Sequence, residues 1–562
     1  MQKLFEIKPK LPPGIVMEEN VYITLRDGIK VVADIYRPAK EGKYPALVST
    51  SGYLKSAQLW PPELNLSIEA GQTQFFVPRG YVHIIYSARG SGLSQGQYNW
   101  YDTVEQQDGA EVIEWAARQS WCNGNVGMLG DSYFGRIQFL VAAQQPPHLK
   151  CIAPFNGSMD DYRSRIDGGV IRLGWLSNWA ADVISQVMLP WPVEGKLPPT
   201  NLIAQVCEHL EDGPWYWERS GYKMVDKIKV PVLSIVVGQS PLHSPSQLAG
   251  YNSIKSPKKL VVLPFARMNA IELRSRPVNE YMLRWYDHWL KGIDTGIMSE
   301  PPIAICDSVT GEWRYEEEYP LSRTKWTKYY FHSGSEGPAT KPPYGQLSTT
   351  EPKDEKADYW ITPDCMNLIQ SNKPVAAYVS SPLENDAKVW GPISVTLYGS
   401  STTIDTVWFA KIGDVAPDGQ VNIIPGVGVL RASLRQVDES KSSPGLPFHP
   451  FQNPVRPEPG KIYEYEISLC PIFRTFKKGH KIWVQVASDD LGYMGEHNTV
   501  YNAYEMLPVP AKNTIYHDSK YPSHLLLPII PDAPEKIAVA VPLSQVKWPL
   551  GETGMQFPYD SE

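Results

Sequence analysis

The sequence predicts an α/β domain that carries a helical insertion and is followed by an all-β domain. Three observations lead to this prediction. Before residue 160, short apolar runs alternate with segments of helical periodicity, which is typical of βαβ units and a mostly parallel sheet. Between residues 160 and 224 amphipathic helical segments dominate. After Pro301 short alternating strands follow one another, separated by turn clusters, which indicates a β-sandwich or jelly roll.

Composition excludes several classes of protein. A net charge of −7 argues against a nucleic-acid-binding surface. The sequence has no run of about 18 apolar residues, which a membrane-spanning helix needs, and its start lacks the apolar region of a secretory signal. The six cysteines are scattered without a C-x-x-C pair, so reduced thiols are expected. We therefore expect a cytoplasmic protein without metal or cofactor, and without nucleic-acid or membrane partners.

The elements of the first domain follow from apolar runs and periodicity. Residues 21–37 predict a β-hairpin around an Arg-Asp-Gly turn. Further strands are predicted at 44–51, 80–87, 151–156, 230–238 and 259–264. Helices are predicted at 103–117, where acidic residues come first, and at 279–292, which ends in a glycine.

These elements divide the chain into four segments. The α/β core comprises residues 1–159 and 225–300, and the helical insertion between them covers 160–224. Such an insertion over the sheet edge is expected to roof a binding site. The all-β domain covers 301–562, with strands predicted at 393–398, 407–412, 463–469 and 481–488.

The segment from Val126 to Gly135, V-G-M-L-G-D-S-Y-F-G, has the layout of a nucleophile elbow. An apolar run ends at a tight turn that holds Ser132, and a helix-compatible segment follows. A serine at such a turn sits in strained backbone at a helix N-terminus, where N–H groups can stabilise an oxyanion. The motif here is G-x-S-x-x-G, because Phe134 stands where the second glycine usually lies. A purely structural strand-turn-helix is the alternative interpretation.

Several longer motifs resemble a known family. They include R-D-G-I-K-V-V-A-D-I-Y-R-P from Arg26, D-G-A-E-V-I-E-W-A-A-R-Q-S-W-C-N-G-N from Asp108, L-R-W-Y-D-H-W-L-K-G from Leu283 and F-K-K-G-H-K-I-W-V from Phe476. The chain resembles the cocaine-esterase-like members of the X-Pro dipeptidyl-peptidase family of α/β-hydrolases. This resemblance implies an α/β-hydrolase core, a helical cap and a C-terminal jelly roll packed against the active-site side. It also implies acyl transfer to water, and the family often forms oligomers, so a homo-oligomer is one expectation.

The resemblance also implies roles for three residues. Ser132 falls on the family's nucleophile position. Tyr53 falls on the tyrosine whose hydroxyl donates to the oxyanion in the esterases, and the backbone N–H of Tyr133 would be the second donor.

The family's acid and base are absent from their usual positions. After the strand at 230–238 the chain reads G-Q-S-P-L-H, without a carboxylate. After the next strand it reads L-P-F-A-R, so Arg267 stands where the histidine is expected. A guanidinium is always protonated and cannot take a proton from serine.

Three hypotheses follow from this departure. In the first, His243 replaces the base and is oriented by Asp160 or Asp161. In the second, the chain is a non-hydrolytic or acyl-transfer enzyme that uses the oxyanion hole and Arg267 to hold a carbonyl or carboxylate. In the third, it is a catalytically inactive binding or scaffold member of the fold.

The expected substrate is a small ester or amide. Four aromatic residues are candidates to line its acyl pocket, although core packing is the more common role for each of them: Trp60, Trp175, Trp179 and Phe265.

Overall fold

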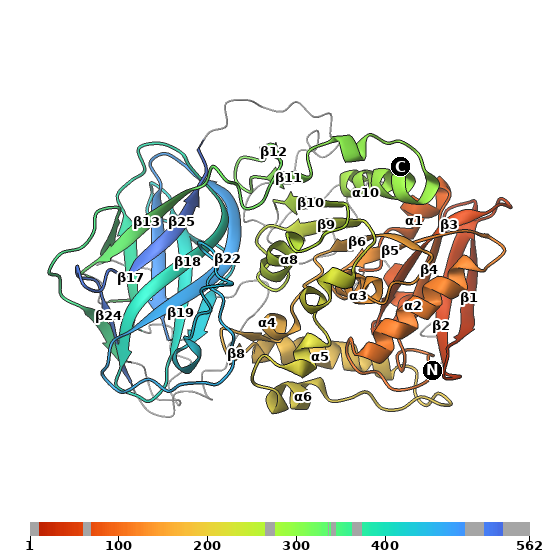
Figure 1. The fold of residues 1–562 in the computed structure, drawn as a ribbon, viewed down its shortest axis with the longest axis horizontal. Helices are drawn as coiled ribbons and strands as arrows, with labels where there is room; N and C mark the ends of the chain where they lie inside the picture. Colours follow the sequence, from red (N-terminus) through yellow and green to blue (C-terminus); the bar gives the residue numbers. More distant parts are fainter. Residues whose placement is uncertain are drawn as a thin grey trace.

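A ten-stranded mixed sheet and a thirteen-stranded all-β sheet form the two halves of the computed structural model, side by side in Figure 1. The structure describes residues 11–59, 69–264, 276–334, 337–338, 344–361, 374–488 and 511–531. Within these residues, no helix is both long and apolar enough to cross a membrane.

The ten-stranded sheet has the order β1-β2-β4-β3-β5-β6-β9-β10-β11-β12. All pairs from β4 through β11 are parallel, whereas β1, β2 and β12 run antiparallel to their neighbours. The strands are β1 (Ile15–Thr24), β2 (Lys30–Pro38), β3 (Tyr44–Ser51), β4 (Val82–Ser87), β5 (Cys122–Asp131), β6 (Leu149–Phe155), β9 (Val232–Val237), β10 (Lys258–Leu263), β11 (Ile303–Cys306) and β12 (Trp313–Glu316). Parallel strands place their carboxyl ends at one edge, where sites in such sheets form.

Helices cover both faces of this sheet. Helices α2 (Thr103–Ala117) and α3 (Tyr133–Ala142) pack on one face within the larger apolar core. Helices α1 (Thr73–Phe76) and α10 (Arg276–Lys291) pack on the other face, in a second apolar cluster around Trp285. Because both faces are covered, the central strands are buried along their length and read as continuous apolar runs.

The segment after β6 forms the helical cap, drawn in ochre at the bottom of Figure 1. It holds α4 (Asp161–Arg165), the short hairpin β7 (Ile166–Asp167) and β8 (Val170–Ile171), α5 (Leu173–Met188), α6 (Leu202–Glu208) and α7 (Pro214–Trp217). Helix α8 (Ser244–Tyr251) then connects β9 to β10.

The second half is all β. Its longest pair is β18 (Ala387–Ser401) with β22 (Tyr463–Phe476), which run antiparallel. The other strands are β13 (Lys325–His332), β14 (Gly337–Pro338), β15 (Gly345–Ser348), β16 (Asp358–Ile361), β17 (Pro374–Ser380), β19 (Val407–Val415), β20 (Val421–Ile423), β21 (Gly428–Arg431), β23 (Lys481–Ala487), β24 (Lys512–Tyr516) and β25 (His524–Ile529).

The predicted order of an α/β core, a helical insertion and an all-β domain is confirmed, and the helix predicted at 103–117 coincides with α2. The domain change predicted at residue 301 remains a prediction. In the structure, β11 pairs in parallel with β10, and β12 pairs with β11. The core sheet therefore ends at Glu316.

Candidate active site

Ser132 lies in the tight turn between β5 and α3. Its φ of 57° is in the left-handed region, which a non-glycine residue rarely adopts. The strained turn is held from both sides: the Ser132 N–H donates to the Phe155 carbonyl at 3.0 Å, and the Ser132 carbonyl accepts from the Arg136 N–H at 2.8 Å. The predicted elbow geometry is confirmed, with Ser132 immediately before the first turn of α3.

Two glycines make this turn sterically feasible. A Cβ on Gly130 would lie 2.2 Å from the Cβ of Phe134, and its φ of 142° is outside the range of other residues. A Cβ on Gly135 would lie 2.1 Å from the Phe155 carbonyl oxygen. Close approach of α3 to β6 therefore requires glycine at position 135, and Phe134 is tolerated because its side chain packs in the core.

The side chain of Tyr133 anchors the start of α3. Its hydroxyl donates to Glu105 at 2.9 Å and accepts from the Tyr98 hydroxyl at 2.8 Å. Glu105 also accepts from the backbone N–H of Tyr101 at 2.7 Å. Burial raises the pKa of Glu105 to about 8. This network fixes the residue whose N–H was predicted to serve the oxyanion.

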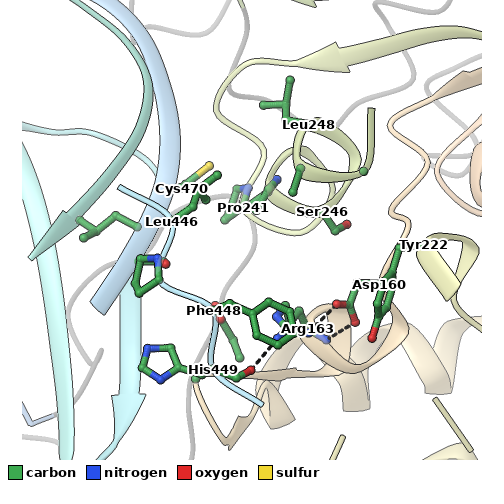
Figure 2. Close-up of a pocket in the computed structure, with 18 of the residues that line it drawn as sticks. Asp160, Arg163, Tyr222, Pro241, Ser246, Leu248, Leu446, Phe448, His449 and Cys470 are labelled. Carbon is green, nitrogen blue, oxygen red and sulfur yellow. Dashed lines mark hydrogen bonds and ion pairs between the residues drawn. The ribbon is translucent and has the colours of Figure 1, made fainter. Parts of the chain in front are cut away.

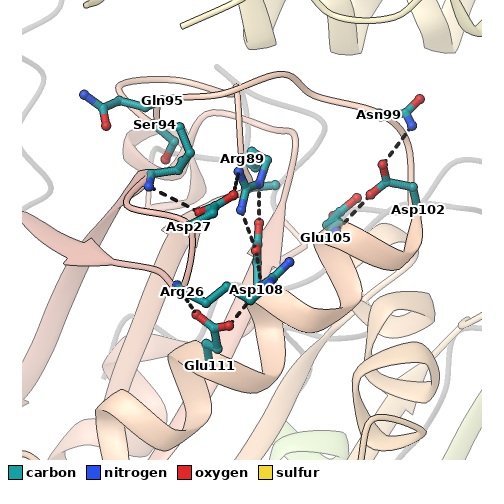
Figure 3. Close-up of polar contacts among 12 residues, drawn as sticks. Arg26, Asp27, Arg89, Ser94, Gln95, Asn99, Asp102, Glu105, Asp108 and Glu111 are labelled. Atoms are coloured by element: carbon teal, nitrogen blue, oxygen red, sulfur yellow. Dashed lines mark hydrogen bonds and ion pairs between the residues drawn. The ribbon is translucent and has the colours of Figure 1, made fainter. Parts of the chain in front are cut away.

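Helix α2, which carries Glu105, is held in place by Arg26 and Arg89. The Asp108 carboxylate accepts hydrogen bonds from Nε and Nη2 of Arg89 at 2.7 and 2.8 Å, and from Nη1 of Arg26 at 2.9 Å. Figure 3 shows both arginines converging on Asp108, one turn of α2 away from Glu105. Asp102 caps the helix by accepting from the Glu105 N–H at 2.9 Å.

Tyr53 lies just after β3 and faces the elbow. Its ring packs edge-on against Tyr133, with 6.0 Å between centroids. Its hydroxyl oxygen accepts from Nε1 of Trp179 at 2.7 Å, which leaves the hydroxyl hydrogen to be donated elsewhere. Trp175 stacks on Trp179, with ring centroids 5.1 Å apart. The Trp179 ring therefore lies between the predicted pocket residue Trp175 and Tyr53.

Glu69 is also at the elbow, although no sequence motif predicts it there. Its carbonyl accepts from the Asp131 N–H at 2.8 Å, and its own N–H donates to Oε1 of Gln58 at 2.8 Å. Burial and the nearby Asp131 carboxyl raise the pKa of Glu69 well above its usual range; the Tyr133 N–H and the Ser132 hydroxyl reach the carboxyl and partly offset this rise. Its enclosed Oε2 has no hydrogen-bond partner among the described residues.

Asp131 forms a second buried carboxyl beside Glu69. Burial raises the pKa of Asp131, and the nearby Asn156 side chain and Ser132 N–H partly oppose this rise. The two carboxyls titrate as a pair, because the charge on one disfavours ionisation of the other. The elbow therefore carries two acids whose protonation changes above the normal carboxyl range.

His243 is buried at the start of α8, on the loop after β9. Its backbone N–H donates to the Ser240 carbonyl at 3.2 Å, so the turn that follows β9 is well formed. The predicted pairing of His243 with Ser132 remains a prediction.

The two acids predicted to orient His243 both contact arginines. Asp160 caps α4 and pairs with Nη1 of Arg163 at 2.6 Å. Asp161 pairs with Arg136 at 2.5 Å and Arg165 at 3.0 Å. Burial would raise the pKa of Asp161, but the two arginines outweigh it and lower the pKa. Their orienting role also remains a prediction.

A cavity of about 460 Å³ lies between the cap, α8 and the all-β domain. Figure 2 shows Asp160 and Arg163 on its cap side, facing Phe448 and His449 of the all-β domain. Arg163 joins the two sides, because its Nη2 donates to the His449 carbonyl at 2.8 Å. The described residues that line the cavity do not include Ser132, Tyr53 or Glu69. Three further candidates, Trp60, Phe265 and Arg267, lie outside the residues that the structure describes.

Comparison with known proteins places this geometry in a family. The family model of the X-Pro dipeptidyl-peptidase (S15 family) matches residues 27–266. The model of the X-Pro dipeptidyl-peptidase C-terminal non-catalytic domain matches residues 295–526. The chain belongs to the X-Pro dipeptidyl-peptidase family. The two matches cover the α/β half and most of the all-β half of the chain.

Individual relatives agree with this assignment. The cocaine esterase of Rhodococcus sp. is 26% identical, and the match covers 91% of this chain and 98% of that protein. A putative Xaa-Pro dipeptidyl-peptidase of Streptomyces avermitilis is 23% identical over 82% of this chain and 76% of the relative. Among solved structures, a CocE/NonD family hydrolase from Staphylococcus aureus superposes with a TM-score of 0.80 at 25% identity, covering 92% of this chain and 94% of the other. The predicted resemblance and the predicted α/β-hydrolase fold are thus confirmed.

Proposed function

We propose that this family member is a serine hydrolase that transfers the acyl group of an ester or amide to water through Ser132. The observation that carries the proposal is the strained backbone of Ser132, with φ of 57°, at the N-terminus of the ten-residue helix α3. This conformation exposes the hydroxyl at the turn, and the helix dipole favours negative charge there.

The oxyanion of the tetrahedral intermediate has two donors of suitable type. The backbone N–H of Tyr133 belongs to the first turn of α3, and Glu105 and Tyr98 fix the Tyr133 side chain. The Tyr53 hydroxyl accepts from Trp179, so its hydrogen is directed away from the indole. Preorganised donors of this kind stabilise the transition state because they need no reorientation as charge develops.

The reaction proceeds in two steps. The Ser132 oxygen attacks the carbonyl carbon, the oxyanion forms, and its collapse expels the alcohol or amine and leaves an acyl-enzyme. Water then attacks the acyl-enzyme and releases the carboxylic acid. Trp175 and Trp179, stacked beside Tyr53, would form an aromatic wall for the acyl group.

Hydrolysis of p-nitrophenyl butyrate tests this function. We expect turnover by the full-length chain, and a loss of at least about 10³-fold in kcat/KM for Ser132→Ala. Equal turnover by wild type and Ser132→Ala would exclude Ser132 as the nucleophile.

Two alternative functions are tested by labelling and by binding. Conversion of a substrate without serine labelling by a fluorophosphonate would favour a non-hydrolytic or acyl-transfer enzyme that uses Arg267. Binding of an ester without any turnover would favour an inactive binding or scaffold protein.

A further inference from the structure

We propose that Glu69 is the general base of this enzyme and accepts the proton of Ser132 in place of a histidine. This inference rests on the proposed function of Ser132 and goes beyond it by naming the missing proton acceptor. It accounts for the absence of the family's histidine from the position that Arg267 occupies.

The backbone around Glu69 is fixed by hydrogen bonds to the elbow itself. Its carbonyl accepts from Asp131, the residue that precedes Ser132, at 2.8 Å. Oε1 of Gln58, a fully buried side chain, accepts from the N–H groups of Glu69 and Ala70 at 2.8 and 3.2 Å. The Ala70 carbonyl in turn accepts from the Ser49 hydroxyl on β3 at 2.9 Å. Glu69 is therefore placed against the nucleophile by the sheet and the elbow together.

The carboxyl of Glu69 faces the groups that a base must reach. The Ser132 hydroxyl and the Tyr133 N–H lie near enough to lower the pKa of this carboxyl, against the rise caused by burial. Its Oε2 is enclosed and has no hydrogen-bond partner among the described residues, so it retains the capacity to accept a proton. A general base needs to lie within hydrogen-bond reach of the proton that it removes, and this contact tightens when substrate is bound.

The electrostatic surroundings make Glu69 a stronger base than an exposed carboxylate. Burial raises its pKa most, and the nearby carboxyls of Asp131 on β5 and Asp182 on α5 raise it further. The hydroxyl of Tyr53 also lies close enough to interact with this carboxyl. A carboxylate with a raised pKa binds a proton more tightly once it is ionised, which favours proton transfer from serine.

Ser132, Glu69, the leaving group and water account for every proton transfer in the reaction. As the Ser132 oxygen bonds to the carbonyl carbon, its proton passes to Glu69 and the C=O π electrons move to the oxyanion. When the intermediate collapses, the bond to the leaving group breaks and Glu69 returns the proton to the leaving alkoxide or amine. In deacylation, Glu69 takes a proton from water and returns it to the Ser132 oxygen as the carboxylic acid leaves.

Glu69→Gln separates a base from a mere hydrogen-bonding residue, because glutamine keeps the size and hydrogen-bonding capacity but cannot accept a proton. With p-nitrophenyl butyrate we expect kcat/KM to fall about 10²- to 10⁴-fold. In the wild type, kcat/KM should rise with pH as the carboxyl pair ionises, and Glu69→Gln should lose this limb. Glu466→Gln is the matched control, since burial also raises the pKa of Glu466 on β22, and its profile should equal that of the wild type.

Chemical rescue distinguishes a general base from a residue that has only a structural role. Glu69→Ala should be inactive and should regain at least about 10-fold in activity with added sodium formate, in proportion to its concentration. Rescue also shows that Glu69→Ala is folded. The role of Glu69 as the base is then tested even if Glu69→Gln does not fold.

The outcomes distinguish the two proposals. If Glu69→Gln retains wild-type kcat/KM while Ser132→Ala is inactive, the base is not Glu69 and the proposed function stands. The same conclusion follows if formate fails to rescue Glu69→Ala. If the wild type neither hydrolyses esters nor reacts with a fluorophosphonate at Ser132, both proposals fail.

Discussion

The backbone N–H of Asp131 donates a 2.8 Å hydrogen bond to the carbonyl oxygen of Glu69. Asp131, which precedes the candidate nucleophile, thus holds the main chain of a residue 62 positions earlier in the sequence. This bond ties the Glu69 backbone, between β3 and β4, to the elbow.

Replacing Tyr53 with phenylalanine should reduce kcat for p-nitrophenyl butyrate about 10²- to 10³-fold, because one donor to the oxyanion is lost. The ring and its edge-on packing on Tyr133 remain, so KM should change little. Steady-state kinetics check this prediction. Tyr44→Phe is the control, since the Tyr44 hydroxyl donates to the Lys40 carbonyl at the surface, and an equal loss in both variants would contradict the role of Tyr53.

Glu105→Gln should alter the pH dependence of stability. The pKa of Glu105 is raised by burial to about 8, so between about pH 4.5 and 8 the folded protein holds a proton that the unfolded chain releases. The free energy of unfolding should therefore fall by up to about 1.4 kcal/mol per pH unit across this window. Glu105→Gln lacks this contribution.

Urea denaturation at a series of pH values compares the two proteins. The stability of Glu105→Gln relative to wild type should rise from pH 4.5 to pH 8 and then level off. A difference that does not vary with pH would show that Glu105 is not neutral in the folded protein.

Gly135→Ala should destabilise the protein by about 3 kcal/mol or more, because its Cβ would lie 2.1 Å from the Phe155 carbonyl oxygen and the backbone of α3 would have to move. Gly213→Ala is the control, since its nearest neighbour would be 3.7 Å away. Thermal unfolding of the three proteins checks the prediction. Similar melting temperatures for both variants would mean that α3 does not approach β6 this closely.

His243→Ala tests the histidine that the sequence proposes as the base. If Glu69 takes the proton, the loss in kcat/KM for His243→Ala should be at least about 10-fold smaller than for Glu69→Gln. The measurement is ester hydrolysis across the pH range for both variants. A larger loss in His243→Ala, with retention of activity in Glu69→Gln, would restore the histidine as the proton acceptor.

Much of the fold could be predicted from the sequence because its signals are local. Apolar runs of six to eight residues became β3, β9 and β10, and the glycine-flanked turn at Ser132 became the elbow. Tyr53 came from the family resemblance, and the structure places it against Tyr133. The pairing of β11 with β10 was not predicted, because β11 is only four residues long and a helix separates the two strands in the sequence.

Glu69 could not be predicted, because no motif surrounds it. Its position depends on the side chain of Gln58 and the backbone of Asp131, neither of which has a sequence pattern that points to Glu69. Conversely, the pair of Asp161 with Arg136 joins α4 to α3, so it forms only when the two helices pack together. Local sequence cannot report which charged side chains the folded chain brings together.

Labelling by a fluorophosphonate shows whether Ser132 is the nucleophile. Full-length protein is treated with the reagent, digested, and analysed by mass spectrometry. We expect one adduct on the peptide that contains Ser132, at a rate that increases with pH, and no adduct in Ser132→Ala. Absence of an adduct on Ser132 in an ester-hydrolysing wild-type protein would contradict the account.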